Sequence, residues 1–439
     1  MADLEQFTKT VHKNTLNNIL LRGIGILCGL VVVNVNLGYL GASLYGLWVT
    51  IASISHWANM GDLGISNGLR NELTKAVAAD DIARQKSLIL TAVKMLSRIA
   101  VVIFVLSCMV AELLFATNVM ESTLRLPLYI TNVFFCITFV LGISRSIAYS
   151  YQKSWYTSLA QTSTTIFQIL SVLLLSWVSV EPDLVVFAIV SGVGSVFGNL
   201  LIIVLMLNVF RCLTAPNIKG GYDKTYRTAI LSVGLQFFVL QLCCLINYST
   251  DSVIINKLFD SVAVTKYSVI TTIYNTGDSV FSLLLISLWS AVTYAAAKNE
   301  YGWIKKEVGS ILKLWMLYCL GVVFVSLLFN QIVHIWLGDS AMHYETDIVM
   351  TFCLYTIITT FGSIYVNVTN GLGRIKLQMY SGVIGSLLNI PLSVFLATTC
   401  GLGLSGIKVA TLLSCYGSVI LVPIDIIRFI KKKTNENKS

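Results

Sequence analysis

The sequence is poor in charged residues and has no extended polar stretch. Lys, Arg, Asp and Glu make up 12% of the 439 residues, about half of the roughly 25% found in soluble domains. Hydrophobic residues make up 56%, and the mean hydropathy is +0.79. A single water-soluble core cannot hold this much apolar surface, so the bilayer is the solvent that fits the composition. The sequence therefore predicts one integral membrane unit.

Residues and motifs of catalytic or metal sites are also scarce. No Gly-rich phosphate loop followed by Lys and Ser or Thr is present, which argues against a built-in ATPase. The ten cysteines lie mainly within apolar runs and show neither metal-ligand spacing nor a disulfide framework. The four histidines are scattered and form no ligand pair: His12, His56, His334 and His343. We therefore expect no enzyme, no catalytic residue, no bound metal and no cofactor.

Long apolar runs recur along the whole chain, separated by short basic segments. In lipid a helix satisfies all its backbone groups internally, and runs such as IAVVIFVLSCMVAELLFA do not alternate as barrel strands would. The N-terminal segment lacks the cleavage site of a signal peptide, so the first run stays as a span. We predict an all-α integral membrane protein with about twelve transmembrane helices, at 15–37, 44–65, 88–114, 127–148, 158–178, 185–208, 229–250, 264–290, 311–334, 347–367, 379–399 and 405–427.

The basic residues are distributed unevenly between the connecting segments. Twelve spans place both termini on one side of the membrane. If that side is the cytoplasm, the inner segments hold 22 of the 30 Lys and Arg residues, and the outer segments hold two, Arg125 and Lys257. Cytoplasmic loops carry such an excess of basic residues. We therefore predict cytoplasmic termini, and the net charge of +9 reflects topology rather than nucleic-acid binding.

The chain also contains an internal repeat. At an offset of 222 positions, Tyr45 aligns with Tyr267 and Arg84 with Lys306, so that in both copies a span leads into a basic loop. Apolar helices can match by chance, but a shared basic loop is not a generic hydrophobic match. We predict two six-helix lobes of the same orientation, 1–220 and 221–439, the second with a basic cytoplasmic tail. Parallel repeats are one known plan for transporters, with the substrate site between the halves.

Two blocks of the sequence carry a resemblance to a known family. The stretch YLGASLYGLWVTIASISHWANMGDLGISNGLRNEL resembles the first conserved block of the Wzx-type polysaccharide flippases, in the MOP transporter superfamily. The matching positions are Tyr39-Leu40-Gly41, Tyr45-Gly46-Leu47-Trp48, Asp62-Leu63-Gly64 and Asn67-Gly68. The second block, NYSTDSVIINKLFDSVAVTKYSVI, is similar to the start of that family's second lobe, with Asp251, Val264 and Tyr267 in place.

The resemblance implies a function and a location. The implied activity is the transfer of undecaprenyl-diphosphate-linked oligosaccharide repeat units, such as O-antigen units, from the cytoplasmic to the periplasmic face of the bacterial inner membrane by alternating access. The implied partners are this lipid-linked cargo, the bilayer, and a polysaccharide polymerase with its chain-length regulator. Two alternatives stay open: a cation-coupled multidrug exporter of the MATE type, and a membrane-embedded enzyme of polysaccharide assembly. A lipid-linked peptidoglycan precursor flippase is a closer relative, but that family typically carries two additional spans.

Six basic residues lie within predicted spans. A charge at mid-bilayer is costly, so such residues normally face protein or a water-filled cavity, unless a long side chain reaches the interface. Lys313 lies at a helix end and is assigned to the interface. The other five are candidate cavity cations, with snorkelling as the alternative for each: Arg22, Lys94, Arg98, Lys266 and Lys408.

Polar residues form stripes on two predicted spans. Spacings of three and four place His56, Asn59 and Asp62 on one helix face, which continues to Ser66 and Arg70. The second stripe lies in the predicted span 264–290 and has the same spacings: Thr271, Tyr274, Asn275, Asp278 and Ser282. The alternative to a cavity is polar packing between helices, which accounts less well for ionised acids. We therefore assign cavity or ion-coupling roles, with a proton or sodium, to Asp62, Asp251 and Asp278, and a polar cavity lining to His56, Asn59, Tyr274 and Asn275.

Overall fold

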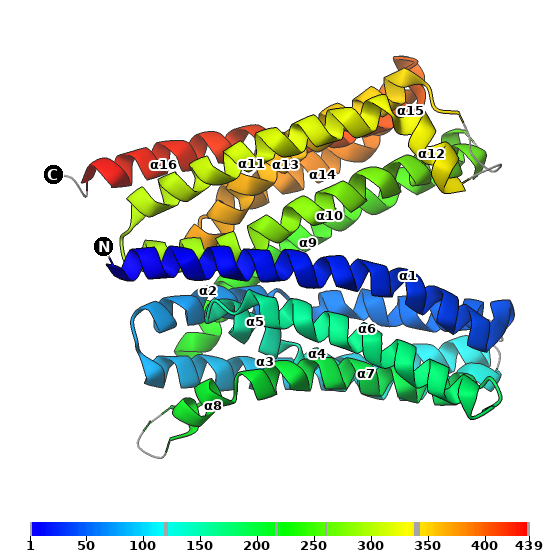
Figure 1. Ribbon diagram of the computed structural model, residues 1–439, viewed down its shortest axis with the longest axis horizontal. Helices are drawn as coiled ribbons and strands as arrows, with labels where there is room; N and C mark the ends of the chain where they lie inside the picture. Colours follow the sequence, from blue (N-terminus) through cyan, green and yellow to red (C-terminus); the bar gives the residue numbers. More distant parts are fainter. Residues whose placement is uncertain are drawn as a thin grey trace. The chain divides into compact units, whose positions relative to one another are not determined.

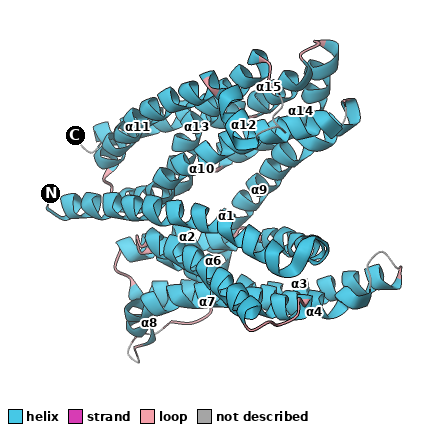
Figure 2. Ribbon diagram, turned by 45° about the vertical axis from the view of Figure 1, so that its right-hand side comes forward, coloured by secondary structure: helices cyan, strands magenta, loops and turns pink. Residues whose placement is uncertain are grey.

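The computed structural model describes residues 2–117, 122–215, 218, 220–259, 261–337 and 343–436. Figure 2 shows that the described segments are helices joined by loops and turns, and no described residue lies in a strand. The predicted all-α class is therefore confirmed. The predicted cavity residues His56 and Asn59 lie outside the described side chains, as do all side chains at positions 2–13 and 52–60.

The chain divides into two compact units, Met1–Leu235 and Gln236–Ser439. In Figure 1 the first unit contains α1 (Ala2–Ala58), η1 (Asn59–Asp62), α2 (Ile65–Ala78), α3 (Ile82–Ala116), η2 (Ser122–Leu124), α4 (Arg125–Leu141), α5 (Ile143–Ser150), α6 (Ser154–Trp177), α7 (Leu184–Leu205) and α8 (Leu207–Thr214). The division falls within α9 (Lys224–Leu258), whereas the predicted lobe boundary falls in the loop before it. That each lobe contains six membrane spans remains a prediction.

The second unit continues from the end of α9. It contains α10 (Ser261–Ala297), α11 (Tyr301–Leu327), α12 (Phe329–Leu337), α13 (Thr346–Leu372), α14 (Lys376–Val394), η4 (Phe395–Thr399), α15 (Gly403–Ser414), η5 (Gly417–Leu421) and α16 (Val422–Glu436). Helix α10 packs along α13, and α14 packs against α15. Buried aromatic and aliphatic side chains form its core, among them Tyr267, Ile270, Phe329 and Phe352.

Ten of the described helices are long and apolar enough to cross a membrane. The count becomes eleven if Gly403–Ser414 and Gly417–Glu436, bent by 50°, form one broken span. These segments coincide with eleven of the twelve predicted spans. The remaining prediction, 44–65, falls on the end of α1 and on η1, where the helix is interrupted.

The first predicted span and part of the second lie on the same helix, α1. Its backbone leaves the helical conformation at Gly41, which has a φ of 70°, a conformation that glycine adopts without a Cβ penalty. The first half of α1 is fastened to α6 by Asn18, whose side chain donates to Ser154 Oγ at 2.9 Å and accepts from Ser158 Oγ at 2.8 Å. Helix α1 therefore carries two segments that meet at Gly41.

Large apolar side chains are exposed on the outside of several helices. On α3, Val101, Met109 and Leu113 are more than half exposed. Contiguous apolar surface of this kind is rare on soluble monomers, and it is expected on a helix that faces lipid. The inward face of α3 instead packs into the core of the first unit, with Leu88 and Ala92 fully buried.

The Asp-Leu-Gly and Asn-Gly motifs of the first block mark a close contact between two helices. Helix α2 crosses the start of α9, and a Cβ built on Gly64 would lie 1.9 Å from the Gly234 carbonyl oxygen. One turn later, a Cβ on Gly68 would lie 2.2 Å from the Ile230 carbonyl oxygen. Gly64 also has a φ of 72°. The two glycines are therefore required because the backbones of α2 and α9 touch.

Candidate functional site

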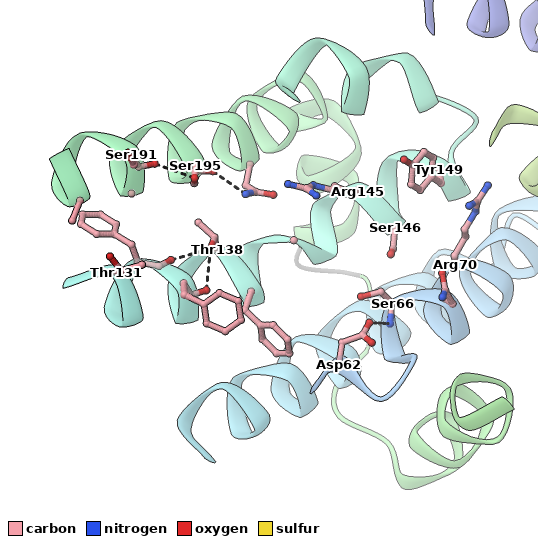
Figure 3. A pocket seen from close by; sticks show the side chains of 18 of the residues that line it. Asp62, Ser66, Arg70, Thr131, Thr138, Arg145, Ser146, Tyr149, Ser191 and Ser195 are labelled. Carbon is pink, nitrogen blue, oxygen red and sulfur yellow. Dashed lines mark hydrogen bonds between the residues drawn. The ribbon is translucent and has the colours of Figure 1, made fainter. Parts of the chain in front are cut away.

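The first unit contains a cavity of about 520 Å³, which we call the N-unit cavity (Figure 3). Six elements contribute to it: α1, η1, α2, α4, α5 and α7. Its polar lining residues are Asp62, Ser66, Asn67, Arg70, Thr131, Thr138, Arg145, Ser146, Tyr149, Ser191, Ser195 and Asn199, and its rings are Trp48, Phe134, Phe135 and Phe139. The lining holds two guanidinium groups and one carboxylate, so the cavity carries an excess of positive charge.

Arg70 is the buried cation of the N-unit cavity. The residue is 6% exposed, and its guanidinium carbon lies 4.4 Å from the centre of the Tyr149 ring. At this distance the ring quadrupole attracts the cation. The two helices are joined next to it, because Ser150 Oγ of α5 donates to the Arg70 carbonyl oxygen at 3.1 Å. Helices α2 and α5 therefore fix the position of this charge, which an arginine keeps at any physiological pH.

Arg145 is the exposed cation of the same cavity. It lies near the start of α5, and Figure 3 shows its side chain extending towards the helix that carries Ser191 and Ser195. Asn199 follows on that helix and is 2% exposed. Its amide nitrogen donates to the Ser195 carbonyl at 2.9 Å, and its Oδ1 has no hydrogen-bond partner among the described residues. This oxygen is itself buried in the wall formed by α7.

Asp62 lines the N-unit cavity but also holds the start of α2. Its Oδ1 accepts from the Gly64 N–H at 2.9 Å and its Oδ2 accepts from the Ser66 N–H at 3.3 Å. A carboxylate at this place satisfies backbone donors that the first turn of a helix leaves free. The predicted stripe Asp62, Ser66 and Arg70 does follow one wall of the cavity. A role of Asp62 in ion coupling stays a prediction.

Three predicted cavity cations of the first unit lie elsewhere. Arg22 of α1 donates to Gln161 Oε1 of α6. Lys94 and Arg98, on the exposed side of α3, face the ring of Tyr222, with the Lys94 Nζ at 4.5 Å and the Arg98 Cζ at 5.9 Å from its centre. None of the three lines the N-unit cavity. Their predicted contact with a cargo stays a prediction.

In the second unit, three of the predicted residues, Asp251, Asp278 and Lys408, belong to one polar group, of which Asp278 is half-buried. Asp251 of α9 and Lys408 of α15 are 4% and 5% exposed. Tyr267 donates to Asp251 Oδ2 at 2.6 Å, and Thr411 Oγ1 lies 3.5 Å from Asp251 Oδ1. Asp278 of α10 accepts from Tyr318 at 2.7 Å. We call this group the C-unit cluster; its members are Asp251, Tyr267, Asp278, Tyr318, Lys408 and Thr411.

The other predicted residues of the second unit have separate surroundings. Tyr274 is buried, hydrogen-bonded to Ser326 Oγ at 2.7 Å, and stacked on Phe329. Its environment is that of a core residue. Asn275, its neighbour, is exposed. Lys266 forms an ion pair with Glu345 at 3.2 Å.

Sequence reasoning missed Arg145 and Tyr149 as cavity residues. Arg145 was counted among the cytoplasmic loop cations because it follows the predicted span 127–148 closely. In the structure α5 continues beyond α4 after Gly142, and it carries both residues into the cavity wall. The available signal was the segment ISRSIAYS, in which polar and apolar residues alternate with the period of an amphipathic helix.

Solved structures with a similar fold are known. A MATE protein in its straight conformation aligns with a TM-score of 0.80 and 13% identity, over 98% of this chain and 97% of that chain. A MOP superfamily transporter from Pyrococcus furiosus aligns with a TM-score of 0.79 and 14% identity, over 98% and 97%. At this identity the likeness shows the fold. The class that the fold defines is a multi-pass, all-α membrane protein with the architecture of these two structures.

Sequence comparisons narrow this class to a family. The family model described as "Polysaccharide biosynthesis protein" matches residues 11–296, more than half of the chain, and the model named MatE matches residues 237–395. The chain belongs to the polysaccharide biosynthesis protein family. The resemblance to the MOP-superfamily polysaccharide flippases is therefore confirmed.

Two curated proteins of similar sequence have names that refer to O-antigen transport or export. A protein of Salmonella typhimurium to which O-antigen transport is ascribed is 20% identical, over 85% of this chain and 86% of its own length. A protein of Yersinia pseudotuberculosis to which O-antigen export is ascribed is 18% identical, over 78% and 79%.

Proposed function

We propose that the protein is a flippase for undecaprenyl-diphosphate-linked oligosaccharide repeat units and moves them from the cytoplasmic to the periplasmic face of the inner membrane. The observation that carries the proposal is the N-unit cavity, in which Arg70 and Arg145 accompany hydroxyl groups and aromatic rings. Its volume of about 520 Å³ lies within the roughly 300–1,000 Å³ typical of ligand pockets.

The lining matches the polar part of such a cargo. A diphosphate and its sugars cannot cross hydrocarbon unaided, whereas the lipid tail can remain in the bilayer. Guanidinium groups bind phosphate oxygens through short, charge-assisted hydrogen bonds. Arg145 is the exposed group that approaches the diphosphate first, and Arg70, held by Tyr149, is the fixed group that keeps the cavity positive. Sugar hydroxyls would form hydrogen bonds with lining hydroxyl groups such as those of Thr131, Ser146 and Ser191, and the phenylalanine rings would pack against sugar faces.

Alternating access completes the proposed mechanism. The cavity binds the head group while it faces the cytoplasm, and it releases the head group after it faces the periplasm. We further propose cytoplasmic termini, from the distribution of basic residues, and contact with a polysaccharide polymerase and chain-length regulator, which would receive the exported unit. Asp62, at the wall of the same cavity, is the proposed ion-coupling acid of the first unit.

A multidrug exporter is the second candidate, because the model named MatE matches residues 237–395. A cavity for cationic drugs should be lined by acids and rings. The N-unit cavity instead has Arg70 and Arg145 against the single acid Asp62, and this excess of positive charge favours a phosphate-bearing cargo.

Deletion of the gene tests the proposal in the native host. Surface polysaccharide should disappear while lipid-linked repeat units still form and accumulate at the inner face. Absence of those lipid-linked units would instead place the protein in their synthesis. Complementation with Arg145→Ala should restore much less export than Arg145→Lys, because Lys keeps the charge and loses only the planar fork. Arg428→Ala, an exposed arginine of α16 outside the cavity, is the matched control and should restore export.

A further inference from the structure

The second unit contains a small polar cavity beside the break between α15 and α16, which we call the break cavity. Its volume is about 90 Å³, and its walls come from the second half of α9, the start of α14, the end of α15 and η5. One water molecule needs roughly 10–15 Å³ of such space, so several fit. The cavity lies entirely within the second unit, and its lining includes no member of the C-unit cluster.

Two buried amide oxygens belong to residues that line the break cavity. Asn247 Oδ1 of α9 and Gln378 Oε1 of α14 have almost no accessible surface, and neither has a hydrogen-bond partner among the described residues. Asn247 as a whole is 7% exposed. Leaving a buried amide oxygen unpaired is costly, so each of these oxygens requires a hydrogen-bond donor.

The serine hydroxyls of the lining offer lone pairs rather than protons. Each donates its proton to a backbone carbonyl oxygen three or four residues before it: Ser381 at 2.8 Å, Ser414 at 2.8 Å and Ser418 at 2.9 Å. A hydroxyl group has one proton and two lone pairs, so what remains for the cavity is acceptor capacity. The thiols of Cys243 and Cys415, also on the lining, are only weak donors. The cavity therefore has an excess of acceptors, and its occupant must supply protons.

The charge of the lining restricts the occupant further. No acidic or basic side chain is among the described residues that line the break cavity. An ion held there would be buried without a counter-charge, which is costly. A neutral donor such as water fits both the charge and the volume, and polar cavities with several hydrogen-bonding groups are where buried water is found.

The position of the cavity supplies a reason for the water. Gly403–Ser414 and Gly417–Glu436 form a membrane segment that is bent by 50°. The outer wall of the bend is tightly packed on α14, because a Cβ on Gly417 would lie 1.9 Å from Ser381 Oγ. A broken helix is tolerated at membrane depth where neighbouring helices, serine side chains and ordered water satisfy its polar groups. Here α14 and the serines are in place, and the cavity is the space for the water.

We propose that the break cavity is a water-binding site, in which water molecules donate to Asn247 Oδ1 and Gln378 Oε1 and join α9 to α14 beside the bend. Water can change its partners as the angle between α15 and α16 changes, so the bend can move without leaving either amide oxygen unpaired. The bend would then act as a hinge during transport. Only this last step rests on the proposed function.

The water can be detected in the purified full-length protein without any cargo. A short X-ray pulse converts water, buried water included, into hydroxyl radicals that oxidise the side chains beside it, and mass spectrometry locates the products. Cys243 lines the cavity and is 7% exposed. Cys353 is the matched control, because it is 6% exposed in the apolar core of the same unit. Cys243 should be oxidised several-fold faster than Cys353.

Filling the cavity should remove the water. A Cβ on Gly382 would make only ordinary contacts, 3.4 Å from Leu240 Cδ2 and 3.9 Å from Cys243 Sγ, so Gly382→Val adds carbon atoms to the cavity. Oxidation of Cys243 should then fall towards that of Cys353. Gly382→Ala adds one methyl group and should have a smaller effect in the same direction. Gly321→Val on α11, where a Cβ has nothing within 4 Å, is the matched control and should keep the oxidation.

Three outcomes would overturn the water site. The first is wild-type Cys243 oxidised as slowly as Cys353, which indicates a dry cavity and needs no variant to be folded. The second is undiminished oxidation of Cys243 in both folded Gly382 variants. The third is a melting temperature raised by sodium or potassium chloride over choline chloride in the wild type but not in Asn247→Leu, which indicates an ion instead of water.

The hinge step has its own test. Gly382→Val should export less surface polysaccharide per folded protein than Gly321→Val, because its bend has lost the water. Normal export by a folded Gly382→Val protein without Cys243 oxidation would overturn the hinge and leave the water site standing. Failure of the wild-type protein in the export experiment would refute the flippase, whereas the oxidation of Cys243 would still decide whether the cavity holds water.

Discussion

The N-unit cavity and the C-unit cluster both contain basic residues on membrane helices, but only the cavity keeps them beside empty space. Arg145 is exposed and Arg70 borders about 520 Å³ of cavity. Lys408 is enclosed by the rings of Phe352 and Tyr355 and faces two acids. A basic residue within a membrane protein can therefore bind a ligand, or it can neutralise acidic residues of the same protein. The empty volume beside the residue and the acids around it distinguish the two cases.

The largest effect on folding is expected at Gly64, at the start of α2, the helix that forms one wall of the cavity. Gly64→Ala should prevent accumulation of folded protein, because the left-handed backbone costs about 1–3 kcal/mol and overpacking against Gly234 costs a further roughly 1–3 kcal/mol. Size-exclusion chromatography of the tagged protein measures this. Gly23→Ala, with nothing within 4 Å of its Cβ, is the control. A monodisperse Gly64→Ala protein with normal melting would show that α2 and α9 can separate.

The next effect concerns the C-unit cluster. Lys408→Met leaves Asp251 buried without its counter-cation, which costs about 3–5 kcal/mol. The double variant Lys408→Met/Asp251→Asn should recover most of this loss. A double-mutant cycle of thermal unfolding gives the coupling free energy. Strictly additive losses would mean that the two residues do not sense each other's charge.

A smaller effect on export should distinguish an arginine that lines the cavity from an arginine that only packs against a ring. Arg70→Ala should reduce export more than tenfold, because a charge-assisted hydrogen bond contributes about 1.5–3 kcal/mol. Arg374→Ala is a close match, since Arg374 also lies 4.4 Å from a ring, that of Phe429, outside the cavity. Export is measured as surface polysaccharide per folded protein. Equal losses in both variants would remove the distinction between a cavity cation and a packing cation.

The smallest effect is expected at Asp62. Asp62→Asn should keep one of the two hydrogen bonds that start α2, because an amide has a single acceptor oxygen, and its stability should change little because Asn caps helices about as well as Asp; Asp62→Ala loses both bonds and should lose about 0.5–2 kcal/mol of stability. If Asp62 also couples an ion, Asp62→Asn should reduce export although its melting temperature is unchanged. Normal export by Asp62→Asn would restrict this acid to its structural role.

The sequence predicted the fold better than the site. Apolar runs are long and local, so eleven of the twelve predicted spans coincide with helices or with the bent pair. The segment 44–65 does not, because the helix is interrupted at η1, where polar residues follow the end of α1. A polar stripe identifies a helix face but not its neighbour. The stripe through Asp62 and Arg70 borders a cavity, while Tyr274 on the other stripe is packed against Phe329. Arg145 was missed because it lies next to the end of a predicted span, where the basic residues of cytoplasmic loops also lie.

The contact between α2 and α9 also bears on the order in which the protein can assemble. The first half of α9 belongs to the first unit but is synthesised after every other helix of that unit. Until it has been inserted, Gly64 and Gly68 lack the backbone against which they fit. A nascent chain that ends at α8 would therefore leave Gly64 and Gly68 uncovered by α9. The first unit is complete only when the first half of α9, up to Leu235, has been synthesised.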